Sequence, residues 1–226
     1  MTGPIIVSDM DGTLTRLEMW RGVLAWIRGH HPSPAARRFV AVRLPRVALV
    51  RLGLIDRLRF RSDWVRDLAT LLRGVDEPGL DAMGEWVVEH HLWPARRESA
   101  LTRIGHELSD LRRGSPDAQL ILATGSFQPV GAAFGRRIGA DVVLGTPLAV
   151  VDGLATGGLA APIQSGDQKA AAVMALADGR TIVQAYGDSG SDIPLLALAG
   201  RAVAVAPDAL LRAEAARRGW EVLDRA

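Results

Sequence analysis

Residues 4–14 read PIIVSDMDGTL, a stretch in which an apolar run is followed by two aspartates, Asp9 and Asp11. Asp-Gly is a common turn pair, which accounts for Asp11 and Gly12 but not for Asp9, because Asp9 stands where a strand should still be half buried. Two carboxylates this close repel each other, so both stay ionised only if a cation lies between them. Mg²⁺ is a hard ion that prefers oxygen ligands. We therefore expect a metal-dependent site here, with a simple polar turn as the alternative.

Polar residues also follow the apolar run LILA at 120–123. Thr124, Gly125 and Ser126 offer a hydroxyl group and exposed backbone N–H groups, which together can form a small anion cradle. The alternative is a helix N-cap, since Ser and Thr favour that position.

Lys169 is the single lysine among 27 basic residues, the others being arginine. It stands early in a helical pattern, where the positive helix N-terminus disfavours a cation. Because Arg and Lys are not equivalent, a lysine in an Arg-biased chain indicates a compact ammonium that neutralises a phosphate and a carboxylate together. An exposed, solubilising lysine is the alternative.

A second pair of aspartates lies in GDSGSD at 187–192, where Asp188 follows a strand-like run and Asp192 comes four residues later. Both carboxylates can face the same crevice if a helix begins at Ser191 or Asp192, which again suggests a metal site. The spacing is not that of the twelve-residue calcium loop. A polar turn with Asp192 capping the next helix is the alternative.

The elements that must position these residues follow from the apolar patterns. Strand-like runs occur at 5–7, 119–123, 141–144, 181–185 and 202–206, and Ala-rich helical stretches occupy 168–177 and 193–199. Strands alternating with helices predict an α/β fold with a doubly wound, mostly parallel sheet. Residues 16–94 show helical patterns without a strand, so we expect an all-helical cap there and a core formed by 1–15 and 95–226. Because ligands bind at the carboxyl ends of such strands, the cap should lie over the site.

The composition bounds the class of protein. The chain has 226 residues, of which 48% are hydrophobic, enough for a sizeable core. It has no cysteine, which excludes disulfides, zinc–thiolate sites and cysteine nucleophiles. We see no secretory signal and no apolar run of ~18 residues that would span a membrane. We therefore expect a soluble, cytoplasmic protein.

In their order along the chain, these stretches resemble the four motifs of the haloacid dehalogenase (HAD) superfamily of hydrolases. The matching residues are DMDGT at 9–13, LILATGS at 120–126, Lys169 and GDSGSD at 187–192. The helical insertion resembles the C1-type cap of subfamily IB, the branch that contains phosphoserine phosphatase. The resemblance covers the whole chain and implies a Rossmann-like core and a phosphatase, because dehalogenating members lack the second aspartate, which here is Asp11.

The resemblance also implies roles for these residues. Asp9 would attack phosphorus and become an aspartyl phosphate, and Asp11 would act as general acid and then as general base. Thr124 and the Gly125 N–H would hold the phosphoryl oxygens, and Lys169 would add a positive charge.

The metal ligands are implied in the same way. Mg²⁺ would be held by Asp9, the main-chain carbonyl of Asp11 and Asp188. Asp192 would act from outside this set by orienting water or Lys169.

Two positions bear on the substrate. In the phosphoserine-specific branch, a glutamate nine residues after the nucleophile and a cap arginine bind the amino acid. Glu18 stands nine residues after Asp9, and residues 60–74 resemble the helix that carries the arginine, but Arg66 falls one position early and Asp67 takes its place. We expect a small, phosphoserine-like phosphorylated metabolite without strict phosphoserine specificity.

An arginine-rich stretch suggests other substrates and partners. Residues 16–73 carry 13 arginines against four acids, while the net charge of the whole chain is +2. At 36–61 the arginines alternate with apolar residues, so the chain could be a phosphatase of a lipid phosphate, of the lysophosphatidate or phosphatidylglycerophosphate type, on an anionic membrane. A cap that packs its apolar stripe inward is the other interpretation.

A non-catalytic module that binds anions or nucleic acid is a weaker alternative. The sequence shows no aromatic platform and no helix-turn-helix pattern that would bind nucleic acid. This interpretation also does not explain why Asp9, Asp11, Lys169 and Asp188 occur together. We therefore expect no nucleic-acid partner.

Overall fold

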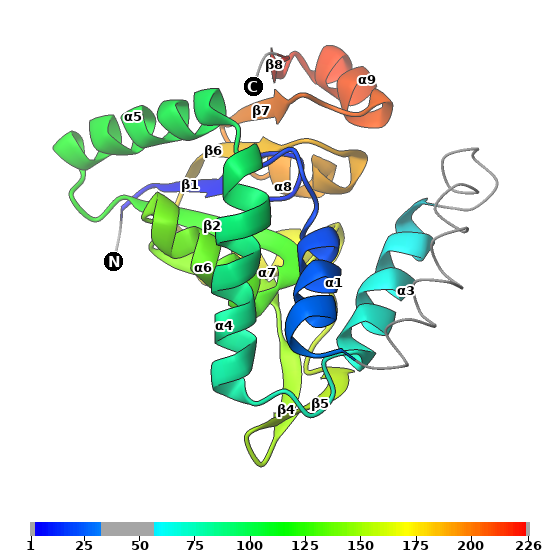
Figure 1. Ribbon diagram of the computed structural model, residues 1–226. Coiled ribbons are helices and arrows are strands. Elements are labelled where there is room, and N and C mark those ends of the chain that lie inside the picture. The colour runs from blue at the N-terminus through cyan, green and yellow to red at the C-terminus, as the bar shows by residue number, and fades with distance from the viewer. Residues whose placement is uncertain (1–2, 33–56, 225–226) are drawn as a thin grey trace.

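The computed structural model describes residues 3–32 and 57–224, with side chains from residue 63 in the second range (Figure 1). Its centre is a six-stranded sheet of parallel neighbours in the order β3-β2-β1-β6-β7-β8. The strands are β1 (Ile5–Ser8), β2 (Gln119–Phe127), β3 (Val142–Thr146), β6 (Ile182–Gly187), β7 (Arg201–Val205) and β8 (Glu221–Leu223). The predicted parallel α/β fold is confirmed.

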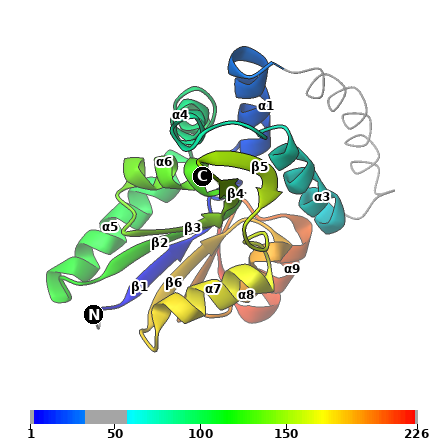
Figure 2. The same ribbon diagram turned by 90° about the horizontal axis from the view of Figure 1, so that it is seen from below.

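Helices cover both faces of this sheet (Figure 2). Successive side chains of a strand point to opposite faces, so a strand that is buried on both sides reads as a continuous apolar run. Ile6 packs in one apolar cluster with α5 (Glu98–Gly114) and α6 (Gln128–Ile138). Ile5 and Val7 pack in another with α7 (Asp167–Ala177), α8 (Ile193–Leu196) and α9 (Ala209–Arg218). This explains the run IIV in β1.

Between β1 and α5, the described residues are mostly helical. The helices are α1 (Met19–His30), α3 (Arg57–Thr70) and α4 (Glu77–Val87), followed by the π-helical turn η1 (Val88–Leu92) and the 3-10 turn η2 (Trp93–Ala95). No strand occurs among the described residues of 16–94, in agreement with the sequence. Figure 2 shows α1 and α3 near the end of the sheet toward which the strand arrows point. The division into a 16–94 cap and a core of 1–15 and 95–226 stays a prediction.

The arginine-rich stretch at 36–61 lies outside the residues whose side chains are described. The two interpretations of that stretch, a membrane-facing surface and an inward-packing cap, therefore stay predictions. None of the described helices is long and apolar enough to cross a membrane.

Four elements differ from the expectation. An antiparallel hairpin of β4 (Leu148–Val151) and β5 (Leu154–Leu159) was not predicted, nor was the three-residue β8. The hairpin turns at Asp152 and Gly153, which both have positive φ. The helix expected at 193–199 is the single turn α8.

The end of β2 also differs. The strand continues through Thr124–Ser126 to Phe127, although its pairing with β3 is irregular between Ala123 and Phe127. The N-cap of α6 is Phe127, and its side chain makes no capping hydrogen bond. The strand predicted at 119–123 is thus too short, and the N-cap alternative for Thr124 and Ser126 is wrong, because both residues lie within the extended backbone of β2.

Candidate active site

A buried ion-pair network joins the first, third and fourth sequence motifs. The Lys169 Nζ atom lies 2.6 Å from Asp9 Oδ1 and 2.7 Å from Asp192 Oδ1. All three residues are almost completely buried. Burial by itself lowers the pKa of Lys169, but the charges of Asp192 and Asp9 more than offset this and raise the pKa above its ordinary value. The solubilising-lysine alternative is wrong, because this lysine serves two buried carboxylates.

The backbone explains why these residues meet. Asp9 follows β1, and its N–H donates to the Tyr186 carbonyl of β6, 3.0 Å away. Lys169 lies in the first turn of α7, where the positive helix end disfavours a cation. The two carboxylates therefore compensate both the burial of the ammonium group and its position on the helix.

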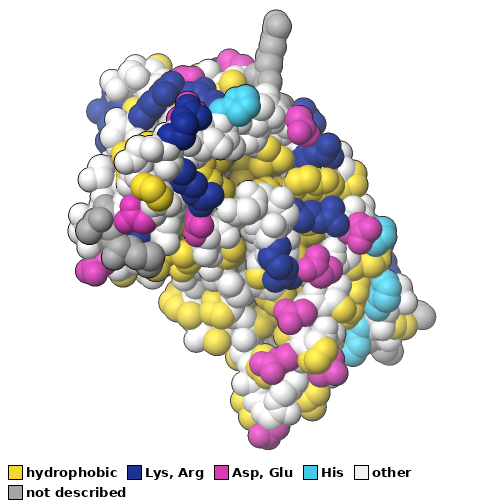
Figure 3. All heavy atoms as spheres, turned by 90° about the vertical axis from the view of Figure 1, so that its left-hand side faces the viewer, with side chains coloured by type: hydrophobic (Ala, Val, Ile, Leu, Met, Phe, Trp, Pro, Cys, Tyr) yellow, Lys and Arg dark blue, Asp and Glu magenta, His cyan; other side chains and the backbone are white. Residues whose placement is uncertain are grey.

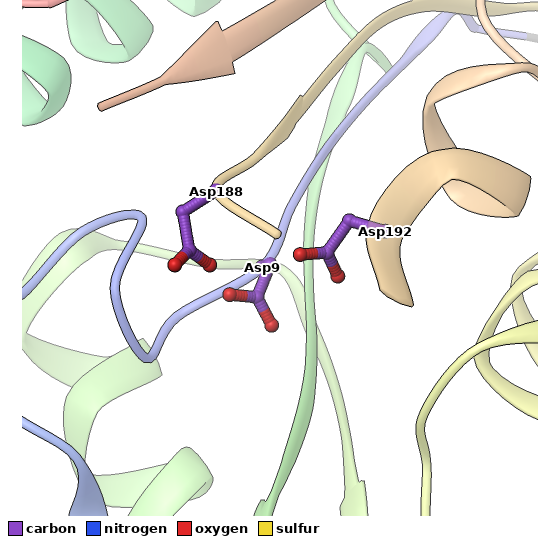
Figure 4. Close-up of side chains that lie close together, drawn as sticks. All are labelled: Asp9, Asp188 and Asp192. Atoms are coloured by element: carbon purple, nitrogen blue, oxygen red, sulfur yellow. The ribbon is translucent and has the colours of Figure 1, made fainter. Parts of the chain in front are cut away.

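Asp188 brings a third carboxylate to this point from the end of β6. Figure 4 shows Asp9, Asp188 and Asp192 converging, and one ligand atom from each lies within 4.8 Å of the others. The Thr13 hydroxyl lies 2.9 Å from Asp9 Oδ2 and 3.3 Å from Asp188 Oδ1. Carboxylate oxygens are the donors that a hard divalent cation prefers, so this cluster could hold one.

Asp192 also orders the loop that carries Asp188. Its Oδ2 atom accepts hydrogen bonds from the Ser189 N–H at 3.2 Å and the Ser189 hydroxyl at 2.9 Å. This reciprocal capping box stabilises the 3-10 turn η3 (Gly190–Asp192). Asp192 occupies the N-cap position of α8, as the alternative expected, but its side chain makes no capping hydrogen bond to that helix.

Asp11 points toward different partners. Its Oδ1 atom accepts a hydrogen bond from the Met19 N–H, 3.0 Å away at the start of α1, and its Oδ2 atom accepts one from the Ser126 hydroxyl. Asp11 is 6% exposed. The second aspartate of the first motif is thus held between the helical insertion and strand β2, apart from the Lys169 network.

The remaining groups of the second motif lie on β2. Thr124 is buried, and its Oγ1 atom accepts the Ser126 N–H at 3.1 Å. Gly125 is half-buried, and its carbonyl accepts the Thr146 hydroxyl at 3.0 Å. A Cβ at Gly125 would lie 3.4 Å from the Gln164 carbonyl oxygen, so the backbone is closely approached there.

The two residues expected to bind substrate lie at the surface. Glu18 is exposed, directly before α1, and accepts a hydrogen bond from the Trp20 indole N–H. Arg66 is exposed on α3, and its ion-pair partner among the described side chains is Asp63 at 3.7 Å. Glu18 is thus next in sequence to the Met19 N–H that contacts Asp11, whereas no described contact joins Arg66 to the carboxylates.

Sequence reasoning missed several supporting groups. Arg97 Nε donates to the Gly12 carbonyl at 2.8 Å, and the charge of Asp188 favours the protonated guanidinium. Burial nevertheless lowers the pKa of Arg97, as does the nearby Arg16. Thr13 stands inside DMDGT, where its position could have indicated a role, but nothing in the sequence pairs Arg97 with Gly12.

A separate hollow opens between α5, α6 and β2. It has a volume of about 250 Å³ and is lined mainly by apolar side chains, among them Trp93, Ile104 and Leu120. Figure 3 shows hydrophobic side chains gathered in a hollow on this side of the molecule. The polar residues of the four sequence motifs do not line this hollow.

Comparison with known proteins identifies the family. The model of haloacid dehalogenase-like hydrolases matches residues 6–197. The chain therefore belongs to this family, as its four motifs predicted. The subfamily IB assignment stays a prediction.

Two relatives are named phosphoserine phosphatases. The chain is 35% identical to SerB1 of Mycobacterium tuberculosis over 167 residues, which covers 70% of this chain and 51% of the relative. It is 29% identical to a protein of Halobacterium salinarum over 208 residues, covering 90% of this chain and 86% of the relative. The chain spans about half the length of the mycobacterial relatives that it matches.

Solved structures show the same fold. A Bordetella pertussis protein of unknown function superposes with a TM-score of 0.78 at 22% identity, with full coverage of both chains. A probable phosphoserine phosphatase from Vibrio cholerae has a TM-score of 0.66 at 19% identity, covering 99% of this chain and 61% of that one.

Proposed function

We propose that this protein is a Mg²⁺-dependent phosphatase that hydrolyses phosphomonoesters of small metabolites through an aspartyl-phosphate intermediate. The observation that carries the proposal is the buried Asp9 carboxylate, which contacts Lys169 at 2.6 Å and converges with Asp188 at the carboxyl end of a parallel sheet. Asp11, two residues later, is held separately by Met19 and Ser126. This separation suits two carboxylates with different tasks.

In the first step, an oxygen of Asp9 attacks phosphorus while the bond between phosphorus and the leaving oxygen breaks. Asp11 gives its proton to that leaving oxygen, and the alcohol departs. In the second step, Asp11 takes a proton from water while the water oxygen attacks phosphorus, and the bond between phosphorus and the Asp9 oxygen breaks. This releases inorganic phosphate and regenerates the Asp9 carboxylate. Lys169, the Thr124 hydroxyl and the Gly125 N–H stabilise the phosphoryl oxygens.

The residues fit a hard divalent cation, because every candidate donor is an oxygen and three carboxylates converge. Asp9, Asp188 and the main-chain carbonyl of Asp11 would hold Mg²⁺, with Asp192 kept behind them by Lys169 and Ser189. A bound Mg²⁺ supplies positive charge that reduces the repulsion between a carboxylate nucleophile and a phosphate.

The names of two relatives and the residues next to the site support the proposed substrate class. Two relatives are named phosphoserine phosphatases, which supports a small phosphorylated metabolite. Glu18 adjoins the site but already accepts the Trp20 indole N–H, and Arg66 pairs with Asp63. We therefore propose a phosphoserine-like ester without a strict requirement for the amino-acid group.

Phosphate release from a panel of esters tests the proposal. The panel contains phosphoserine, sugar phosphates, nucleotides and 4-nitrophenyl phosphate, and also lysophosphatidate and phosphatidylglycerophosphate in micelles. We expect Mg²⁺-dependent release that EDTA stops and that Asp9→Asn reduces by more than about 10³-fold, the scale of losing an essential nucleophile. Asp152→Asn, in the β4–β5 turn, is the matched control and should keep full activity.

The best substrate distinguishes the alternatives. Preference for a soluble metabolite supports the proposal, and preference for a micellar lipid phosphate would favour the membrane interpretation of 36–61. Release that persists in Asp9→Asn would show a different nucleophile. Absence of release from every ester would favour a binding module.

A further inference from the structure

Ser126 is a buried hydroxyl that none of the proposed steps uses. It is 1% exposed, and its hydroxyl donates a hydrogen bond to Asp11 Oδ2 across 115 residues of sequence. Its own N–H donates to Thr124 Oγ1 at 3.1 Å. Ser126 therefore connects the proposed phosphoryl-binding hydroxyl to the proposed acid/base carboxylate.

We propose that Ser126 is a positioning residue that aims the Asp11 carboxylate at the leaving oxygen of the substrate. The inference rests on the proposed phosphatase function and adds to it a residue on which proton delivery depends. Side chains at i and i+2 of a strand lie on one face, so β2 presents Thr124 and Ser126 together. One strand can thus place the phosphoryl group and the proton donor relative to each other.

Met19 and Ser126 both contact Asp11, but the chemistry of their groups differs. The Met19 N–H is only a donor, so it favours a carboxylate oxygen without a proton. A protonated carboxyl group keeps acceptor capacity, so Asp11 Oδ2 can accept the Ser126 hydroxyl on one side and carry the transferable proton on the other. Ser126 can therefore keep its contact with Asp11 before and after the proton moves, and the orientation of Asp11 survives the whole cycle.

A purely structural role is the competing explanation, since a buried carboxylate needs hydrogen-bond partners for stability alone. The two roles differ in their dependence on the leaving group. An alkoxide is a poor leaving group and needs the proton from Asp11, whereas 4-nitrophenolate leaves without one. A positioning role thus affects alkyl esters selectively, whereas general damage to the site affects both classes equally.

The experiment compares kcat/KM for an alkyl phosphate and for 4-nitrophenyl phosphate in wild type, Ser126→Ala and Ser126→Thr. General acid catalysis contributes about 10²–10⁴-fold, so we expect Ser126→Ala to lose roughly 10–100-fold on the alkyl ester, mainly in kcat, and less than about threefold on the aryl ester. Ser126→Thr keeps the hydroxyl and should restore the ratio. An equal loss on both esters in Ser126→Ala would overturn the proposal.

Ser8→Ala is the matched control. Ser8 is also fully buried, but its hydroxyl donates at 2.7 Å to the main-chain carbonyl of Asp9 and does not contact Asp11 Oδ2. We expect Ser8→Ala to leave the alkyl-to-aryl ratio unchanged. A ratio that shifts in Ser8→Ala as much as in Ser126→Ala would overturn the assignment to Ser126.

Crystal structures of wild type and Ser126→Ala separate this inference from the proposed function. If wild type hydrolyses no ester, the phosphatase proposal fails, and the structures still test the positioning role. A changed side-chain rotamer of Asp11 in Ser126→Ala supports it. An Asp11 carboxylate that keeps its place without the serine hydroxyl overturns it.

Discussion

Gly12 lets the two acidic motifs approach each other. Its φ is +90°, and a Cβ atom there would lie 2.1 Å from Asp188 Oδ2. A side chain at this position must therefore displace the carboxylate. We predict that Gly12→Ala lowers kcat by roughly 100-fold, because a misplacement of about 1 Å at a reacting group costs that much. The free energy of unfolding should also fall by about 1–3 kcal/mol from backbone strain. Phosphate release and thermal unfolding measure the two effects.

Gly179→Ala separates the strain from the clash. Gly179 has a φ of +80°, and no atom lies within 4 Å of its hypothetical Cβ. This variant should lose a similar free energy of unfolding and keep its activity. If both variants lost activity equally, contact with Asp188 would not be the cause.

The convergence of Asp9, Asp188 and Asp192 predicts a measurable response to metal. A cation that binds only the folded state raises its stability, by about 2.7 kcal/mol at 100 times the dissociation constant. We expect Mg²⁺ to raise Tm in wild type, EDTA to reverse the rise, and Asp188→Asn to diminish it. Asp152→Asn, which changes an aspartate in a distant turn, should respond like wild type. An undiminished Mg²⁺ response in Asp188→Asn would mean that Asp188 holds no metal.

At this scale the sequence predicted the residues that lie in short motifs and missed those joined only by the fold. Asp9 and Asp188 follow apolar runs whose ends meet at one edge of a parallel sheet, so their proximity could be inferred, and Lys169 was singled out as the single lysine at the start of a helix. Ser126 was visible in LILATGS, but its partner Asp11 lies 115 residues away. Arg97 contacts Gly12 from 85 residues away, and no local pattern indicates that pairing.

At the scale of elements, α4 packs very closely on α6 at Gly84. A Cβ atom at Gly84 would lie 2.4 Å from the Pro129 carbonyl oxygen, so only glycine permits this approach. Replacing a helical glycine by alanine gains about 1 kcal/mol of helix propensity, but overpacking a tight contact costs about 1–3 kcal/mol. The 2.4 Å approach is to backbone, which cannot move aside cheaply, so we predict that the cost exceeds the gain and that Gly84→Ala destabilises the protein by up to about 2 kcal/mol in urea unfolding.

Gly105 in α5 offers the opposite case. It is exposed within the helix, and nothing lies within 4 Å of its hypothetical Cβ. Gly105→Ala should therefore stabilise the protein by about 0.5–1 kcal/mol. Equal effects of the two substitutions would contradict the close packing of α4 on α6.

The elements found from sequence are those with a strong apolar period. The buried strands β1, β2, β6 and β7 read as apolar runs, and α7 reads as an Ala-rich helix. The edge strand β8 has three residues and no fully buried one, so its pattern is too short to recognise. The β4–β5 hairpin has exposed Val151 and Leu154 beside its turn, which obscures the alternation of a half-buried strand.

On the scale of the whole molecule, ion pairs gather where strands β7 and β8 form one edge of the sheet and on the nearby helix α9. Glu221 accepts hydrogen bonds from Arg103 and, at 2.6 Å, from Arg201. The hydrogen bond from Arg103 lowers the pKa of Glu221 to about 2, against a smaller opposing effect of burial. In α9, hydrogen bonds from Arg217 and Arg218 lower the pKa of Glu214 to about 2.

These pKa values predict how stability depends on pH. A carboxyl group whose pKa is lower in the folded state than its unfolded value of about 4.3 stabilises the fold above that value, and the contribution is lost as pH falls toward the folded pKa. We therefore expect the free energy of unfolding to decline between about pH 4.5 and pH 2. Because the affected carboxylates lie in β8 and α9, amide exchange should accelerate there first.

Glu221→Gln tests whether this edge controls the acid response. The Glu221 side chain is 36% exposed, so solvent screening limits its contribution to about 1 kcal/mol or less. The variant should be slightly less stable than wild type at pH 7, equally stable near pH 2, and correspondingly less sensitive to acid. Glu89→Gln, in the exposed part of η1, should follow the wild-type curve. If Glu221→Gln declined as steeply as wild type between pH 4.5 and pH 2, the acid sensitivity would arise elsewhere, and the exchange data would show which elements open first.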